Sequence, residues 1–589
     1  MENRKITIGE IKGEKTLLEL LQRRGVYVPA YCGGSGTCGK CRVRILREAP
    51  LPTEAERACL TADELERGVR LACLTAPGAG MEIEILAGDE AEMQVETAVK
   101  MEPAGPAAAE TEPAGPAAAK TPGTPERPDA SKDSGGFQSG VQGASGILPG
   151  CRSGKQAGAS AQILAAVDIG TTTVVMAAVD AASGRILETA AGVNHQRAFG
   201  ADVISRIDAS NHGKGDLLRN SILQDLDRLQ VQLGLPRNTP RVISGNTTMQ
   251  HLLQGLSCKT LGVAPYTPVD ISLHEYCPQE HDDRPQDHDC CPQEMEKVTT
   301  ECPEAAAQNG VSVAMPDDTS GAKPSPVMTM LPGISTYVGA DIVSGIIACG
   351  MDRSEEICIL VDLGTNGEMA IGNCDRIVCA STAAGPAFEG GNIHCGMAGI
   401  PGAVSAVEIT DGKASVETIA GAPPAGLCGT GVLETMYELL KEEIVDETGC
   451  MEDEWMEEGF PLAEGVVFTA KDVRELQLAK AAVRAGLEVL LQVFGADYED
   501  IGRLYIAGGF GQKINLEKAV GIGLLPEELL DRMEPVGNSS LAGAVMAAGN
   551  PAVLDRMVRA AQMAEETALA ENPLFSDLYM EHMFFPEQE

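Results

Sequence analysis

Two short segments far apart in the chain repeat one local design, and this repetition constrains the fold more than any other feature of the sequence. They read AAVDIGTTTVVMAAV, with Asp168 and Gly170, and ILVDLGTNGEMAIG, with Asp362 and Gly364. Each predicts a strand, a tight turn and a second strand. Backbone N–H groups and hydroxyls in such a turn can surround phosphate oxygens, while the Asp meets a magnesium ion through water. Two copies predict duplicated halves that close on one phosphate chain.

A third segment, RLYIAGGFGQKIN, ends an apolar strand in Gly508 and Gly509. Glycines there permit close approach of a flat adenine or ribose. A single GG turn is usually an ordinary loop, but the ordered trio of segments favours nucleotide binding. Strands alternate with helical patterns from Gln162 to the C-terminus, which is typical of α/β architecture.

Two further segments allow two interpretations each. VISGNTTMQHLL contains Asn246 and Thr247, and GLCGTGVLETM opens a helix at Gly429. These residues can contact a terminal phosphate, since helix N-termini attract anions, or they can be ordinary helix caps. We expect His251 to be structural and Asp472 to cap a long amphipathic helix.

Four cysteines near the N-terminus have the spacing of metal ligands. In YCGGSGTCGKCRV, Cys32, Cys38 and Cys41 are separated by five and two residues, and Cys73 follows after thirty-one more. Four thiolates are the ligand set of a [2Fe-2S] cluster, and the surrounding glycines let the loop turn its N–H groups toward cluster sulfurs. A zinc site is the alternative, but zinc ribbons usually carry two CxxC knuckles. Cys59 is the alternative fourth ligand.

Composition divides the chain into three parts. Residues 1–92 predict a small cysteine-bearing domain, 93–161 an Ala/Pro/Gly-rich flexible linker, and 162–589 a large domain with a disordered insertion at about 271–326. The insertion is rich in Asp, Glu and Pro, and its cysteines and histidines fit no zinc-finger spacing.

The charge balance excludes some partners. A formal net charge of -40 repels nucleic-acid phosphates and anionic lipid surfaces. The sequence contains no signal peptide and no apolar run of membrane-spanning length, so it predicts a cytoplasmic protein with neither nucleic acid nor membrane as a partner.

Each ordered part resembles a known family. The N-terminal residues resemble β-grasp [2Fe-2S] ferredoxins with adrenodoxin-like spacing, which implies that Cys32 and Cys38 hold one iron and Cys41 and Cys73 the other. Residues from about 162 to 550 resemble the superfamily of acetate and sugar kinases, heat-shock ATPases and actin. The resemblance implies a duplicated actin-like, ribonuclease H-like ATPase domain.

The whole set of motifs, DIGTTT, SGNTTM, LPGIS, DLGTNGE and GGFG, resembles the reductive activators of corrinoid-dependent methyltransferases. This family passes one electron from a [2Fe-2S] cluster to a Co(II) corrinoid protein and restores Co(I) with the help of Mg²⁺ and ATP. The resemblance implies a corrinoid protein and an upstream low-potential electron donor as partners, and it is compatible with a homodimer. The insertion and the linker depart from the family pattern.

Site roles follow from the resemblance by position. It implies that Asp168 and Asp362 organise Mg-ATP and that Glu368 orients the attacking water. The phosphate contacts it implies are Thr171, Thr172, Thr173, Thr365 and Asn366.

Two other functions remain open from the sequence. One is a small-molecule kinase with a regulatory ferredoxin domain, for which the chain shows no clear acceptor site or catalytic base. The other is a redox-responsive, ATP-driven switch, which predicts nucleotide-dependent binding without electron delivery.

Overall fold

The computed structural model describes residues 4–9, 11–30, 32–47, 49–86, 162–278, 327–509 and 513–587. The linker predicted at 93–161 lies outside these residues, as does 279–326 of the predicted insertion. In the described part of the chain, no helix combines the length and the hydropathy that a membrane span requires.

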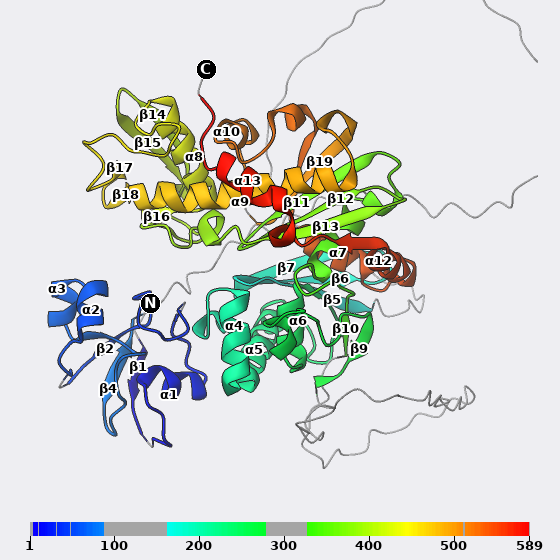
Figure 1. Cartoon of the computed structure of the whole chain (residues 1–589). Helices are drawn as coiled ribbons and strands as arrows, with labels where there is room; N and C mark the ends of the chain where they lie inside the picture. The colour runs from blue at the N-terminus through cyan, green and yellow to red at the C-terminus, as the bar shows by residue number, and fades with distance from the viewer. Residues whose placement is uncertain are drawn as a thin grey trace, which may run out of the picture. The chain divides into compact units, whose positions relative to one another are not determined.

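The N-terminal domain is a four-stranded sheet of order β1-β4-β2-β3 with a helix packed on it (blue in Figure 1). Helix α1 begins after Thr16, whose hydroxyl accepts the N–H of Glu19 in a capping box. Its apolar face buries Leu17, Leu20 and Leu21 completely against the sheet residues Val43 and Ile83. These contacts confirm the predicted β-grasp domain. Its elements are β1 (Arg4–Thr7), α1 (Leu17–Arg23), β2 (Arg42–Ile45), α2 (Glu54–Cys59), α3 (Ala62–Glu66), β3 (Val69–Leu71) and β4 (Glu82–Ile85).

The first half of the large domain contains a six-stranded sheet of order β7-β6-β5-β8-β10-β9. Strands β5, β6 and β7 form an antiparallel meander, and β8 and β10 add in parallel to β5. The elements are β5 (Ile163–Ile169), β6 (Thr173–Asp180), β7 (Arg185–Val193), α4 (Val203–Ala209), α5 (Gly215–Gln232), β8 (Arg241–Gly245), α6 (Thr247–Gln254), β9 (His274–Tyr276), β10 (Met328–Met330) and α7 (Ala340–Ala348).

The second half repeats this plan in a sheet of order β20-β19-β11-β12-β13-β21. Its elements are β11 (Ile357–Leu363), β12 (Gly367–Gly372), β13 (Ile377–Thr382), β14 (Ala403–Thr410), β15 (Lys413–Thr418), β16 (Gly426–Leu427), α8 (Gly429–Lys441), β17 (Phe460–Ala463), β18 (Val466–Phe468), α9 (Ala470–Phe494), β19 (Ile501–Ala507), α10 (Leu516–Gly521), β20 (Met533–Gly537), α11 (Ser539–Ala547), α12 (Pro551–Met563), β21 (Ala564–Glu566) and α13 (Pro573–Glu581).

The order of the strands demonstrates the predicted duplication. Five strands of each sheet, taken in chain order, occupy the same places: β5, β6, β7, β8 and β10 correspond to β11, β12, β13, β19 and β20. In both halves the first two strands form an antiparallel hairpin, and the later two are parallel to the first. The two hairpins are the repeated segments of the sequence, so both strand–turn–strand predictions are confirmed.

Helices α7 and α11 share a buried core with residues from both sheets. The two helices cross so closely that a Cβ at Gly543 would lie 2.4 Å from the carbonyl oxygen of Ser344, so only glycine fits there. Both helices begin where the hairpin turns lie, because Asp341 and Asn538 at their starts line the same cavity as those turns.

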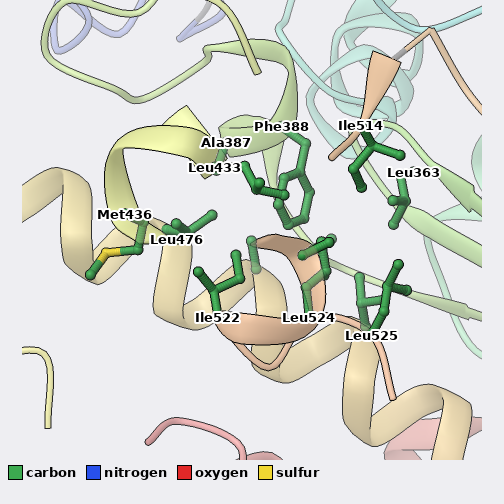
Figure 2. Close-up of a cluster of buried hydrophobic side chains, with 14 of the residues drawn as sticks. Leu363, Ala387, Phe388, Leu433, Met436, Leu476, Ile514, Ile522, Leu524 and Leu525 are labelled. Atoms are coloured by element: carbon green, nitrogen blue, oxygen red, sulfur yellow. The ribbon is translucent and has the colours of Figure 1, made fainter. Parts of the chain in front are cut away.

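A separate core fills the second half between its sheet and helices α8 to α10. Figure 2 shows part of it, with Leu433 and Met436 from α8, Leu476 from α9, and Phe388 near Leu363. Leu363 ends β11, so this packing fixes the start of the second hairpin turn.

Two expectations about local structure are wrong. Asp472 does not cap α9: Thr469 is the cap, and Asp472 is its third helical residue, whose carboxylate accepts the N–H of Thr469 in a capping box. Residues 271–278 are not part of a disordered segment, because β9 pairs antiparallel with β10 there.

Candidate functional site: an iron-sulfur loop and an interlobe nucleotide cavity

The four predicted cluster cysteines lie as two pairs. Cys41 and Cys73 have their sulfurs 3.3 Å apart, and the thiols of Cys32 and Cys38 are hydrogen-bonded to each other. Across the described residues no group of three or more Cys, His, Asp or Glu side chains is placed so that it could hold a metal ion as it stands. Two pairs are the arrangement that a two-iron cluster needs, since each iron takes two thiolates.

The loop around these cysteines affects the thiols of Cys32 and Cys38 differently. Burial disfavours the charged form of Cys32, but hydrogen bonds from Ser35 and from the backbone of Cys38 and Thr37 outweigh it and lower its pKa to about 5. Burial raises the pKa of the Cys38 thiol. The loop follows positive φ angles at Gly33, Gly34, Gly36 and Gly39, as its composition predicted. The residues therefore fit a [2Fe-2S] cluster.

Cys59 lies beside this loop without joining either pair. Its thiol faces the carbonyl oxygens of Gly36 and Thr37 at 3.9 and 3.8 Å. A Cβ on Gly39 would be 3.1 Å from the Cβ of Cys59, so glycine at 39 makes room for this side chain.

A cavity of about 280 Å³ lies between the two hairpin turns of the large domain. It gathers the predicted nucleotide residues from both halves, with one exception. The predicted residues that line it are Asp168, Gly170, Thr171, Thr172, Thr173, Asn246, Asp362, Gly364, Thr365, Asn366, Glu368, Gly429, Gly508 and Gly509.

The exception is Thr247, which does not line the cavity. Its hydroxyl donates to the carbonyl oxygen of Ser335 at 2.6 Å, and the side chain is buried. Asn246 is an ordinary cap as well as a cavity residue: Oδ1 accepts the N–H of Met249, and Nδ2 donates to Thr171 Oγ1. His251 is structural as expected, since its ring bonds the backbone of Thr247 and Val269.

The two glycines of the third segment serve different purposes. A Cβ on Gly508 would lie 2.5 Å from the carbonyl oxygen of Leu363 and 2.9 Å from Asp362 Oδ1. Close approach at Gly508 therefore involves strand β11 rather than a ligand. A Cβ on Gly509 would meet no described atom within 4 Å, so this position retains space for a flat group.

Asp168 is held by the start of helix α11. Asn538 Nδ2 donates to its Oδ2 at 2.8 Å, and Ser540 Oγ donates to its Oδ1 at 2.7 Å. Ser540 also contacts Ser244 at 2.9 Å, and Ser244 contacts Ser344 of α7 at 3.0 Å. A buried chain of hydroxyls thus joins the carboxylate of the first half to both central helices.

Three further carboxyl groups that line the same cavity have raised pKa values, mainly because they are buried. Burial, followed by the negative charges of Asp341, Asp168 and Glu389, raises the pKa of Asp362 to about 8. Burial and Asp168 raise the pKa of Asp341 to about 7. Burial, Asp341 and Asp362 raise the pKa of Glu368, which lies opposite Asp362 in the β11–β12 ladder.

Several residues of this site lie outside the sequence prediction: Asp341, Glu389, Asn538 and Ser540 all line the cavity. Asp341 directly follows Ala340 at the start of α7, and Asn538 precedes α11, so acidic and amide residues at helix starts were the available signal. Such residues are usually caps, and the sequence alone does not separate the two roles.

Family models match most of the chain on both sides of residues 79–163. Residues 1–78 match the 2Fe-2S iron-sulfur cluster binding domain, 164–284 and 303–354 match the RACo middle region, and 356–589 match the C-terminal domain of RACo, the ASKHA domain.

Curated relatives agree. The chain is 30% identical over 455 residues to corrinoid activation enzyme RamQ of Eubacterium limosum, covering 71% of this chain and 70% of that protein. It is 29% identical over 273 residues, 42% of this chain and 50% of the relative, to the [Co(II) methylated amine-specific corrinoid protein] reductase of Methanosarcina barkeri.

A solved structure, the reductive activator for corrinoid, iron-sulfur protein, matches with a TM-score of 0.61 and 26% identity over 98% of this chain and 97% of that chain. With its paired thiols, duplicated hairpins and these matches along its length, the chain belongs to the RACo family of corrinoid activators, with an N-terminal 2Fe-2S domain and a C-terminal ASKHA domain.

Proposed function

We propose that this protein uses Mg-ATP to drive the transfer of one electron to a Co(II) corrinoid protein, which returns the cobalt to Co(I) for methyl transfer. One observation carries the proposal: the same chain contains two kinds of site. The first is a set of paired thiols with the spacing of a ferredoxin, and the second is a cavity lined by two phosphate-type turns. One electron leaves the reduced iron-sulfur domain, and one electron reduces Co(II) to Co(I), so the step balances.

Cys32, Cys38, Cys41 and Cys73 would hold the cluster, which supplies one-electron chemistry at low potential. The positive φ angles of the glycines shape the loop around these thiols, and hydrogen bonds favour the thiolate of Cys32. The relatives' names support the acceptor: one is called a corrinoid activation enzyme and another a corrinoid protein reductase.

The cavity's charge supports Mg²⁺ as the companion of ATP. Asp168, Asp341, Asp362 and Glu368 all have raised pKa values, mainly because burial disfavours their ionised forms, so carboxylates and a polyphosphate can share this site only with a compensating positive charge. A divalent cation offsets both sets of negative charge and favours ionised carboxylates. Asp168 lies on the first hairpin and Asp362 on the second. This placement would let the two carboxylates align Mg-ATP between the halves of the domain.

The proposal includes a cytoplasmic location, an upstream low-potential donor that reduces the iron-sulfur domain, and a homodimer as the working assembly. Nothing in the chain's charge favours nucleic acid as a partner, since the formal net charge is -40.

The test is anaerobic reduction of the purified full chain, followed by addition of a Co(II) corrinoid protein from the same source. We expect the Co(I) absorption to rise only when Mg-ATP is present. Cys73→Ser should abolish the rise by removing a cluster ligand, and Asp362→Ala should abolish its dependence on ATP.

Cys59→Ser is the matched control, because Cys59 lies beside the cluster loop but outside both thiol pairs. It should retain the [2Fe-2S] spectrum and Co(I) formation. ATP hydrolysis without Co(I) for any corrinoid protein offered would contradict the proposal and favour a kinase or a switch.

A further inference from the structure

Glu389 joins the two phosphate-type turns. Its Oε2 accepts hydrogen bonds from Thr172 Oγ1 at 2.8 Å and from Thr365 Oγ1 at 2.6 Å. The two hydroxyl oxygens, one from each half of the domain, are themselves only 3.5 Å apart. One carboxylate oxygen therefore closes the gap between the hairpins, in the place where the predicted phosphate ligands converge.

The contact excludes a phosphate at the same hydroxyls. A threonine hydroxyl has one proton to donate, and both a carboxylate and a phosphate oxygen can only accept. Thr172 and Thr365 therefore bond to Glu389 or to a phosphate, but not to both. The negative charges of the two acceptors add to this competition.

The backbone that carries Glu389 is fixed. Ala387 and Phe388, the two preceding residues, are buried in the core of the second half, where Figure 2 shows Phe388 near Leu363 and Ile514. The following Gly390 has φ +73°, and a Cβ there would lie 2.6 Å from the carbonyl oxygen of Met397. A phosphate at the two threonines must therefore displace the side chain of Glu389, while the buried residues before it anchor its backbone.

We propose that Glu389 determines the preference of this site between ATP and ADP: its carboxylate occupies the place of the terminal phosphate in the nucleotide-free protein, and only a nucleotide with that phosphate displaces it. The inference rests on the proposed ATP site and deepens it. A diphosphate ends before the two threonines and leaves the Glu389 contact in place. When a triphosphate binds, its terminal phosphate replaces Glu389 as the group that bridges the two halves of the domain.

The experiment measures dissociation constants of the full-length protein for AMPPNP and for ADP, both with Mg²⁺, by isothermal titration calorimetry. For Glu389→Ala we expect AMPPNP to bind at least about tenfold more tightly, because one competing hydrogen bond to a charged group accounts for a factor of about ten and Glu389 makes two. ADP binding should change by less than about twofold. Glu389→Gln, which keeps the shape but removes the charge, should shift the AMPPNP constant in the same direction by less.

Glu368→Gln is the comparison variant. Glu368 lines the same cavity and is buried, but its Oε1 accepts from Asn366 rather than from either threonine. This substitution leaves both threonine contacts of Glu389 in place, so it should not raise the affinity for AMPPNP relative to that for ADP. A selective gain in AMPPNP binding by Glu368→Gln would overturn the assignment to Glu389.

Thermal unfolding is a second measurement, and it distinguishes a change in nucleotide affinity from a general loss of stability in the variant. Without nucleotide, Glu389→Ala should unfold at a lower temperature than the wild type, because the bridge between the halves is lost. With saturating AMPPNP that deficit should disappear. An AMPPNP affinity that is unchanged or weaker in both Glu389 variants would overturn the inference while leaving the ATP site intact. A wild type that binds neither nucleotide would overturn the ATP site and the inference together.

Discussion

At the scale of single residues, the buried carboxyl of Asp362 makes the stability of the nucleotide-free protein depend on pH. Its pKa is raised to about 8 in the folded protein, against about 3.9 for an unfolded Asp. The carboxyl therefore contributes stability that is complete below about pH 4 and is lost as the pH rises through 8. We expect Asp362→Asn to flatten the decline in melting temperature between pH 6 and 9 and to melt about 2–4 °C higher than the wild type at pH 9. Differential scanning calorimetry without nucleotide measures this, and a lower melting temperature at pH 9 would show that the carboxyl is ionised and stabilised there.

The repeated residues of the site were predictable, and the isolated ones were not. Asp168 and Asp362 stood out because each follows an apolar strand and precedes a Gly-Thr turn. Glu389 and Asp341 have no such repeated surroundings, and tertiary contacts alone bring them to the cavity. Thr247 shows the opposite case, because a hydroxyl at a helix start satisfied the pattern but bonds to Ser335.

At the scale of elements, the start of α11 acts both as a helix cap and as a support for Asp168. Asn538 Oδ1 accepts the N–H of Leu541 at 2.7 Å while its Nδ2 donates to Asp168. Asn538→Ala should cost about 1–2 kcal/mol of stability and weaken Mg-AMPPNP binding, because Asp168 loses one of its two donors. Chemical denaturation and calorimetry measure the two effects.

The control is Asn572→Ala, which removes a comparable cap from α13, where Asn572 accepts the N–H of Leu574 at 3.0 Å. It should cost similar stability without changing nucleotide affinity, since Asn572 does not line the cavity. Equal losses of affinity in both variants would mean that the effect on binding comes only from reduced stability.

The strength of the sequence signal decided which elements were predictable. The two hairpins and the long helix α9 have clear periodicity and clear ends, and the structure has all three. The cap of α9 was misplaced because Thr469 and Asp472 both satisfy a capping pattern. The short strand β9, HEY, is too polar to be distinguished from the acidic segment that follows it.

At the scale of the whole molecule, the ferredoxin-type domain and the ATPase domain have separate hydrophobic cores. We therefore expect AMPPNP with Mg²⁺, at about 100 times its dissociation constant, to stabilise the ATPase domain by about 2.7 kcal/mol and leave the ferredoxin-type domain unchanged. Calorimetry follows the first, and loss of the cluster's visible absorption on heating follows the second. Asp362→Ala should remove the shift, and an equal shift in both signals would show that the two domains unfold as one unit.

The pairing of β9 with β10 also determines how the large domain tolerates changes in length. Tyr276 faces Met328 across this pair, so the chain leaves the sheet and returns to it at adjacent points. The entropy of closing a connection between two such paired strands grows only with the logarithm of its length, by about 0.6 kcal/mol for each doubling. This position at the edge of the first sheet is thus a natural place for insertions of very different size to accumulate, and an experimenter can use it to install an affinity tag or a fluorescent reporter.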